Sequence, residues 1–450
     1  MNLTDLIREP EGKTLEFKRD LSSADPFLRS VVAFANTAGG TVLIGIEDKT
    51  RRVRGIADPL ALEERVASLI ADSISPQVLP DIEILRYRDR NVLAVRIYPS
   101  PTRPHHLGSD SETGTYVRVG STNRKADEDL IAEMRRFTRG QFFDERPMPN
   151  LDSEAIDFRA ASESFSEYRK LGLGDLDILR LCTTHQGRSV PTVGGILLFG
   201  RDRLAHFPDA WIQAGRFAGD DRTNIVDRAD LQMPLTETIP AAIAFIERHM
   251  AAGVEIGPVR GAPRWTLPPA AVREALVNAV AHADYSQRGA PIRIAIYNNR
   301  LEVENPGLLP FGLTLEDLPR GVSKVRNRVI GRVFHELRLV EQWGSGVQRM
   351  VGTCKDAGLA PPVWEEIGNR LRVTMTTERV GEAAMDSTDQ KIMDVLDIGP
   401  GRGTSEVARA ISLSTRATRT RLARLVERGL AVEVGTGPRD PKRRYFRAAR

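Results

Sequence analysis

The pattern of hydrophobic and polar positions divides the chain into three regions, of which the first covers residues 1–145. Apolar residues three and four positions apart predict helices over 26–36, 62–74 and 126–137. Short apolar runs predict strands over 14–17, 41–46, 92–98 and 116–119. This mixture predicts an α+β domain that ends before Pro147 and Pro149, where the chain enters a linker.

The second region, residues 150–378, mixes the same two patterns. Helical spacing recurs over 235–250 and 269–283, and strands are expected over 210–217 and in the buried apolar run GGILLFGRD. The segment IRIAIYNNRLEVENPG holds two alternating runs joined by Asn298-Asn299-Arg300, which predicts a β-hairpin. A second mixed domain is therefore expected.

The third region, residues 386–450, has the outline of a winged helix-turn-helix. Small polar residues over 376–387 predict the linker that precedes it. Helices are expected in DQKIMDVLDIG, TSEVARAI and SLSTRATRTRLARLVERGL, the last with Ser414 as a helix N-cap. AVEVG and YFRA, joined by the turn PRDPKRR, predict a two-stranded wing. The sequence thus predicts a multidomain α+β protein.

Charge is spread unevenly along the 450 residues. The whole chain has a formal charge of +4, whereas residues 386–450 carry 14 Lys and Arg against 8 Asp and Glu, an excess of six positive charges. A basic module on a near-neutral body is typical of nucleic-acid binding. The residues expected to contact DNA are Ser414, Thr415, Arg416, Thr418, Arg419, Arg421, Arg439, Lys442, Arg443 and Arg444. A solvated basic helix, or a winged helix used for dimerisation, is the alternative.

Other features of the sequence limit the class of protein. No apolar stretch approaches about 18 residues, so no membrane span is expected, and MNLTDLIREP lacks the pattern of a signal peptide. Cys182 and Cys354 stand alone and suggest neither a zinc site nor a disulfide framework. We therefore expect a cytoplasmic protein.

Two motifs in the first region resemble a known family. EGKTLEFKRD, followed by FANTAGGTVLIGIEDK, is similar to the Schlafen/AlbA-type domain of many bacterial predicted regulators over about residues 9–130. The resemblance implies nucleic-acid binding. In nucleolytic members it also implies a metal-dependent site, which falls here on Glu11, Glu16 and Asp48 with Mg²⁺ or Mn²⁺.

Each of these motifs also has a structural interpretation. The three carboxylates could instead cap helices or pair with Lys18 and Arg19. Asn36 and Thr37, with the following Gly39-Gly40, are more typical of a tight turn than of a phosphate cradle. His105-His106 could be a metal pair, but we interpret them as exposed loop histidines.

The helix REALVNAVAHADY resembles the N-box of a divergent GHKL ATPase subgroup, over about residues 160–375. The resemblance implies an α/β sandwich that binds ATP with Mg²⁺, with Glu274 as general base and Asn278 as metal ligand. It assigns further cofactor contacts to His282, Asn305, Gly307, Gly344 and Gly346. The usual Asp-x-Gly is Asn305-Pro306-Gly307 here, so the adenine acceptor is an uncharged amide. No Gly-x4-Gly-Lys-Ser/Thr motif is present, which argues against a helicase motor.

Three functions follow from these patterns. The preferred hypothesis is a DNA-binding transcriptional regulator, dimeric as such regulators often are, whose activity depends on ATP. The alternatives are a metal-dependent nuclease acting on RNA or DNA, for which defence is one role, and a non-enzymatic nucleic-acid-binding scaffold. Enzymatic activity, either weak ATP hydrolysis or nucleolysis, is left open.

Overall fold

The computed structural model describes residues 3–255, 262–340, 345–379, 387–396, 401–427, 430–434 and 443–447. They form two compact units, one of residues 1–357 with 361–376 and the other of residues 358–360 with 377–450. Both contain helices and sheets, which confirms the mixed α+β, multidomain class. The three domain boundaries expected from the sequence remain a prediction.

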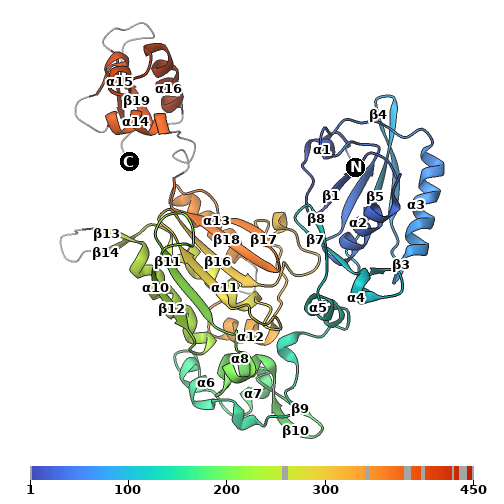
Figure 1. Cartoon of the computed structure of the whole chain (residues 1–450). Helices are drawn as coiled ribbons and strands as arrows, with labels where there is room; N and C mark the ends of the chain where they lie inside the picture. The colour runs from blue at the N-terminus through green and yellow to red at the C-terminus, as the bar shows by residue number, and fades with distance from the viewer. Residues whose placement is uncertain are drawn as a thin grey trace. The chain divides into compact units, whose positions relative to one another are not determined.

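The first part of the larger unit is built on a four-stranded sheet in the order β1-β2-β5-β4 (Figure 1). The strands are β1 (Leu15–Lys18), β2 (Gly40–Ile44), β5 (Arg90–Ile97) and β4 (Asp81–Tyr87). β1 runs parallel to β2, with Leu15 opposite Thr41. Helix α2 (Ala24–Asn36) buries Phe27, Val31 and Phe34 in the core beside this sheet, which confirms the helix predicted over 26–36.

Further elements accompany this sheet. They are α1 (Leu3–Arg8), α3 (Pro59–Ser73), β3 (Ile74–Ser75), β6 (His106–Leu107), α4 (Ser111–Gly114), β7 (Tyr116–Val119), β8 (Thr122–Lys125) and α5 (Glu128–Thr138). The side chain of Asp127 caps α5 by accepting a hydrogen bond from the Leu130 amide. Helix α5 leads toward the second part of the unit.

The second part of the larger unit contains a six-stranded sheet in the order β12-β11-β15-β16-β18-β17. The strands are β11 (Ile212–Phe217), β12 (Ile225–Leu231), β15 (Ile292–Ile296), β16 (Arg300–Pro306), β17 (Val363–Ile367) and β18 (Arg370–Thr376). β15 and β16 form the predicted antiparallel hairpin, whereas β11 and β15 pair in parallel. Helices α10 (Leu235–Met250) and α11 (Pro269–His282) pack against this sheet.

The remaining elements of this part are shorter. They are α6 (Phe158–Phe165), α7 (Asp175–Ile178), β9 (Cys182–His185), β10 (Arg188–Pro191), α8 (Val193–Phe199), α9 (Arg203–His206), β13 (Ala251–Glu255), β14 (Ala262–Trp265), α12 (Arg328–Glu336) and α13 (Gly346–Asp356). Asp144, in the chain between the two parts, accepts hydrogen bonds from the first three amides of α12. This buried carboxylate satisfies donors that a helix start leaves unpaired.

One predicted strand is a helix. The run GGILLFGRD was expected to be a buried strand, but its apolar residues form α8, whose seven residues are all buried. The Thr192 hydroxyl accepts a hydrogen bond from Gly195 N, which starts the helix. A side chain at Gly194 or Gly195 would collide with Val329 or with the Leu181 carbonyl. Burial on every side removes the periodicity that separates a helix from a strand.

The described residues of the smaller unit form three helices and a two-stranded antiparallel sheet. They are α14 (Ser387–Leu396), α15 (Thr404–Ala410), α16 (Thr415–Glu427), β19 (Ala431–Val434) and β20 (Arg444–Arg447). Ile392, Val407, Leu422, Leu425 and Tyr445 share one buried core. The order of elements is the one predicted from the sequence.

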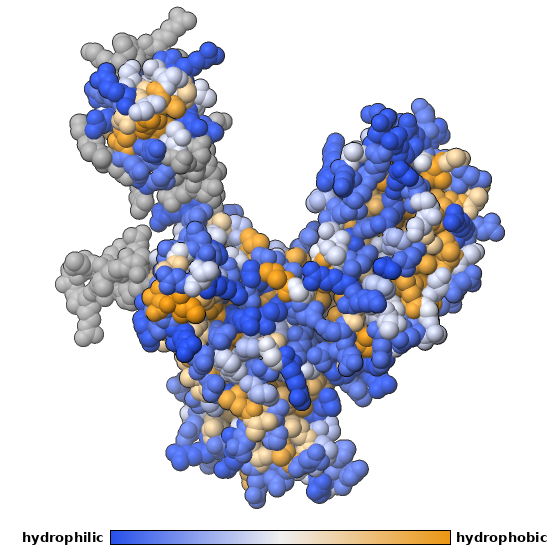
Figure 2. All heavy atoms as spheres, viewed as in Figure 1, coloured by the Kyte–Doolittle hydropathy of each residue, from blue (hydrophilic) through white to orange (hydrophobic). Residues whose placement is uncertain are grey.

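Hydrophilic side chains dominate the visible face, and hydrophobic ones reach it only in small patches (Figure 2). Among the described residues, no helix combines the length and the apolar character needed to cross a bilayer.

Candidate functional site

A cavity of about 970 Å³ lies in the larger unit between α11, α13 and the six-stranded sheet. Its remaining walls come from residues 133–143, which include the C-terminal half of α5, from loop 308–313, and from residues 318–340, which include α12. This volume is at the upper end of the range for small-molecule sites. The sheet therefore supplies the floor, and three segments distant in sequence close the sides.

The cavity brings together most of the cofactor residues expected from the sequence. Its lining includes Glu274, Asn278 and His282, which repeat at four-residue intervals on α11, with Asn305 from β16 and Gly346 from α13. Gly307 is not part of the lining but lies beside it, where an added Cβ would collide with the guanidinium of Arg326. Gly344 lies outside the described residues.

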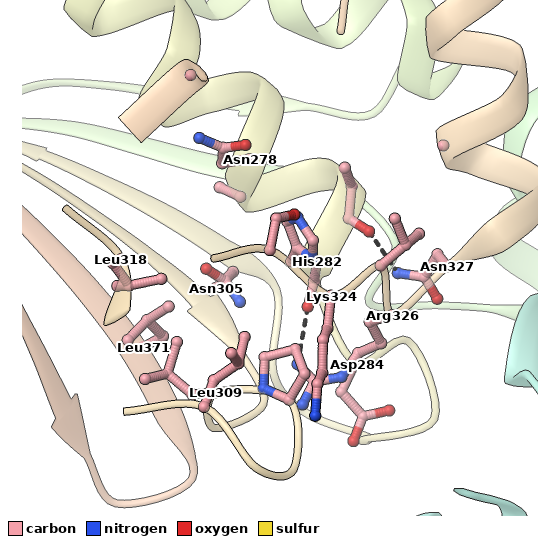
Figure 3. A pocket seen from close by; sticks show the side chains of 18 of the residues that line it. Asn278, His282, Asp284, Asn305, Leu309, Leu318, Lys324, Arg326, Asn327 and Leu371 are labelled. Atoms are coloured by element: carbon pink, nitrogen blue, oxygen red, sulfur yellow. Dashed lines mark hydrogen bonds between the residues drawn. The ribbon is translucent and has the colours of Figure 1, made fainter. Parts of the chain in front are cut away.

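Polar and apolar groups are separated within the cavity (Figure 3). Asn278 and His282 lie along α11, and Asn305 lies on the facing strand with Leu309, Leu318 and Leu371 grouped beside it. The amide nitrogen of Asn305 donates to the Pro306 carbonyl, which is 3.0 Å away. An apolar slot next to an amide is suited to a flat heteroaromatic ring with a hydrogen-bonding edge.

The end of α11 is held by residues that the sequence analysis did not single out. Asn327 Nδ2 donates to the carbonyls of Ala281 and Ala283, at 3.0 and 2.7 Å, and Arg326 Nη1 donates to the His282 carbonyl at 2.8 Å. These bonds satisfy carbonyls that a helix end leaves unpaired. The basic run Lys324-Val325-Arg326-Asn327-Arg328, between the hairpin and the glycine-rich segment, was the available signal.

His282 is neutral in this setting. Its Nδ1 atom is buried without a hydrogen-bond partner. Burial and, to a smaller extent, the nearby Arg326 together lower the pKa of His282 to about 4. A neutral imidazole nitrogen can accept a hydrogen bond from a ligand, which fits the polar side of the cavity.

We expect His282 to make stability depend on pH. The unfolded chain binds a proton at pKa about 6.5 and the folded chain only near 4, so the free energy of unfolding falls as the pH drops through this window. His282→Gln is expected to remove on the order of 1–2 kcal/mol of the loss between pH 7.5 and pH 5. Urea unfolding followed by tryptophan fluorescence measures it, because all four tryptophans lie between residues 211 and 364. An equal pH dependence in both proteins would contradict this prediction.

Glu274 is close to the glycine-rich segment. A Cβ atom added to Gly346 would collide with Glu274 Oε2, so only glycine leaves the carboxylate in place. Glu274 Oε1 also lies 3.2 Å from Arg349 Nη1. This ion pair holds the carboxylate at the cavity wall and neutralises part of its charge.

The three N-terminal carboxylates lie near one another. Glu11 accepts a hydrogen bond from Phe17 N at 2.6 Å. Burial raises the pKa of the Glu11 carboxyl, and the neighbouring Glu16 and Asp48 carboxyls raise it further. The fold therefore brings together the residues expected from the EGKTLEFKRD and FANTAGGTVLIGIEDK motifs.

Each carboxylate oxygen of Glu16 pairs with a positively charged side chain. Its Oε1 lies 2.5 Å from Lys18 Nζ and its Oε2 lies 2.5 Å from Nη2 of the buried Arg118. Arg118 also donates to the carbonyl of Gly12 at 3.0 Å, so it anchors the whole stretch. Among the described residues, no three His, Cys, Asp or Glu side chains are placed to hold a metal ion. The observed arrangement of Glu11, Glu16 and Asp48 therefore does not fit Mg²⁺ or Mn²⁺. We derive no cleavage step from it.

Two further residues of this domain are structural. Asn36 is buried, donates to the carbonyls of His105 and Tyr116, and accepts from His105 N, which leaves its amide no free group for a phosphate. His105 is fully buried, with Nδ1 2.7 Å from the Pro76 carbonyl. The interpretation of both histidines as exposed is therefore wrong for His105.

The predicted DNA-contacting residues of the smaller unit divide into two sets. Thr418 is fully buried and donates to the Ser414 carbonyl. Arg421 and Arg424 both pair with the buried Asp389. We therefore leave Thr418 and Arg421 out of the proposed DNA contacts.

Several of the other predicted residues are exposed on α16 or directly before it. They are Ser414, Thr415, Arg416 and Arg419, to which the structure adds Thr420. On β20 and just before it, Arg443 lies 3.1 Å from Glu433, and Arg444 donates to the Gly401 carbonyl at 2.6 Å. Arg439 and Lys442 lie outside the described residues.

Two family models match parts of the chain. Residues 11–127 match the family described as Schlafen, AlbA_2, and residues 289–375 match "Putative ATP-dependent DNA helicase recG C-terminal". The first match contains the carboxylate set, and the second contains Asn305, loop 308–313 and Gly346. No match was found among curated proteins.

Solved structures with some likeness to the chain include two bacterial proteins. The DIP2311 protein from Corynebacterium diphtheriae is 19% identical, with 97% of this chain and 95% of that chain covered and a TM-score of 0.42. The N-terminal domain of a putative ATP-dependent DNA helicase RecG-related protein from Nitrosomonas europaea is 20% identical, with 28% and 94% covered and a TM-score of 0.23. Neither TM-score supports an argument about the fold. The family models identify a Schlafen/AlbA-type domain at the N-terminus and a RecG-like, ATPase-like domain in the middle of the chain.

Proposed function

We propose that this chain is a DNA-binding transcriptional regulator whose middle domain binds ATP with Mg²⁺. The single observation that carries the proposal is the cavity, which gathers Glu274, Asn278, His282, Asn305 and Gly346 from three separate elements. These residues were expected to meet because of a resemblance to the GHKL fold. Their convergence supports an α/β sandwich of that kind.

The chemistry of the cavity fits a nucleotide. The Asn305 amide and the three leucines beside it suit the purine, while the buried, unpartnered Nδ1 of His282 accepts from a hydroxyl or amino group. Lys324 donates to the Phe311 carbonyl at 2.8 Å and brings a positive charge to the cavity wall. When bound, Mg²⁺ would neutralise phosphate charge, and Asn278 is the residue that would hold it.

The smaller unit supplies the DNA-binding part of the proposal. Arg416 and Arg419 lie on the exposed side of α16, near its N-terminal end, where a recognition helix contacts base edges. Asp389 ties the opposite side of α16 to α14 through Arg421 and Arg424. A helix fixed in this way can present its free arginines in a defined direction, as a winged helix-turn-helix requires.

Footprinting on fragments of the source genome tests the regulator proposal. We expect the full chain to protect a preferred site, because arginines that reach base edges discriminate between sequences. A pattern of protection with no preferred site would contradict a regulator and favour a non-specific nucleic-acid-binding scaffold.

A further inference from the structure

Loop 308–313 is a wall shared by the cavity and the N-terminal domain. Leu308, Leu309, Pro310, Phe311 and Leu313 line the cavity. The other side of the same six-residue loop contacts the Schlafen/AlbA-type domain directly at two places, and it is joined to that domain at a third through Glu366 of β17. A ligand that presses on the loop from within the cavity therefore acts on a segment that is already attached to the other domain.

The first contact reaches the FANTAGG motif. Gly312 N donates to the Thr37 carbonyl at 3.1 Å. Thr37 ends α2, and its own amide donates to the carbonyls of Ala33 and Phe34. The loop is thus bonded to the end of the central helix of the N-terminal domain.

The second contact reaches the EGKTLEFKRD motif. Glu366 Oε1, on β17, accepts from Leu309 N at 3.0 Å and lies 2.5 Å from Lys13 Nζ. The side chains of Lys13 and Glu366 are only 9% and 2% exposed. One carboxylate oxygen therefore joins the cavity wall to a residue two positions from Glu11.

The third contact is apolar and aromatic. Leu308 and Phe311 belong to the same buried cluster as Val117, Leu130 and Met134 of the N-terminal domain. The guanidinium of Arg103 lies 4.8 Å from the centre of the Phe311 ring, and its Nε and Nη1 atoms have no hydrogen-bond partner. Because apolar burial holds this part of the loop in place, the loop can transmit a change without detaching.

We propose that ligand binding in the cavity is coupled to the Schlafen/AlbA-type domain through loop 308–313, and that Lys13 and Glu366 form the link to the carboxylate stretch. This inference rests on the proposed ATP-binding function and adds its regulation. Coupling of this kind is reciprocal, so nucleic acid bound at the N-terminal domain would change the affinity for ATP by the same factor. Glu366 is a positioning residue, since it acts through Leu309 and Lys13.

Hydrogen exchange of the full chain with and without ATP and Mg²⁺ tests the coupling. In the wild type we expect ATP to slow exchange about fivefold in residues 11–18 and 34–41, which adjoin the two polar contacts. Glu366→Gln keeps an oxygen for Leu309 N but removes the ion pair. In this variant the slowing should disappear at residues 11–18 and persist at 34–41, where the Gly312–Thr37 bond remains.

Calorimetry on the same proteins measures ATP affinity and so separates a loss of ATP binding from a loss of coupling. Glu366→Gln should bind ATP within about threefold of the wild type, and Lys13→Met tests the same ion pair from its other side. Glu163→Gln removes a charge from an exposed pair with Arg159 and should behave as the wild type. Failure of the wild type to bind ATP would overturn the proposed function and the coupling together. ATP binding without slowing at either 11–18 or 34–41 would overturn the coupling alone. Slowing at 11–18 that persists in both variants would overturn the role of Lys13 and Glu366 as the link.

Discussion

Replacing Asn278 with alanine is expected to weaken the binding of ATP with Mg²⁺ on the order of 10- to 100-fold. Asn278 lies on the cavity side of α11, between Glu274 and His282, and its amide oxygen is the group proposed to hold the metal. Losing a hydrogen bond or ligand to a charged group costs about 1.5–3 kcal/mol. Each 1.4 kcal/mol corresponds to about tenfold in affinity. Isothermal titration calorimetry on the full chain measures the change.

A matched control variant tests whether the loss of ATP affinity is specific to the cavity. Asn224→Ala makes the same chemical change at an exposed position outside the cavity lining, and it should leave ATP affinity unchanged. Far-ultraviolet circular dichroism should be the same for both variants and the wild type. Wild-type affinity in Asn278→Ala would show that this amide does not contact the bound nucleotide or its metal.

Removing Arg416 and Arg419 together is expected to reduce DNA affinity on the order of 100-fold. Their side chains lie on the exposed side of α16, whereas Arg421 and Arg424 are engaged with Asp389. An arginine at a base edge contributes about 1–3 kcal/mol, and an arginine at a phosphate contributes about one unit to the salt dependence. Fluorescence anisotropy at several salt concentrations measures both quantities on one DNA site.

The control for the Arg416 and Arg419 double variant removes two positive charges from another part of the chain. Arg159→Ala with Lys170→Ala takes two exposed positive charges from the larger unit and should change DNA affinity only slightly. If the two double variants bind DNA equally well, α16 is not the surface that contacts DNA.

Several elements were predicted correctly, because the spacing of apolar residues within the segment itself determines whether it forms a helix or a strand. The helix at Leu235–Met250 and the strand at Tyr116–Val119 have the bounds read from the sequence. The hairpin of β15 and β16 also follows from alternation and a short polar turn. The α8 segment was misread because the apolar run is buried on all sides and carries no period.

In the candidate site, too, local patterns predict some features and miss others. Glu274, Asn278 and His282 could be placed together because they share one helix face. The contribution of α5 to the cavity and the bond between Lys13 and Glu366, 353 positions apart, depend on how the two parts of the larger unit pack. No local pattern predicts a partner at such a separation. Likewise, Arg421 looked like a DNA contact until its ion pair with the buried Asp389 was visible.

The most direct test of the account is the affinity of the full chain for its footprinted DNA site, measured with and without ATP and Mg²⁺. A nucleotide-controlled regulator should change that affinity by about fivefold or more, and Asn278→Ala should abolish the change. An affinity for DNA that is the same at saturating ATP and without nucleotide would contradict control of DNA binding by the cavity.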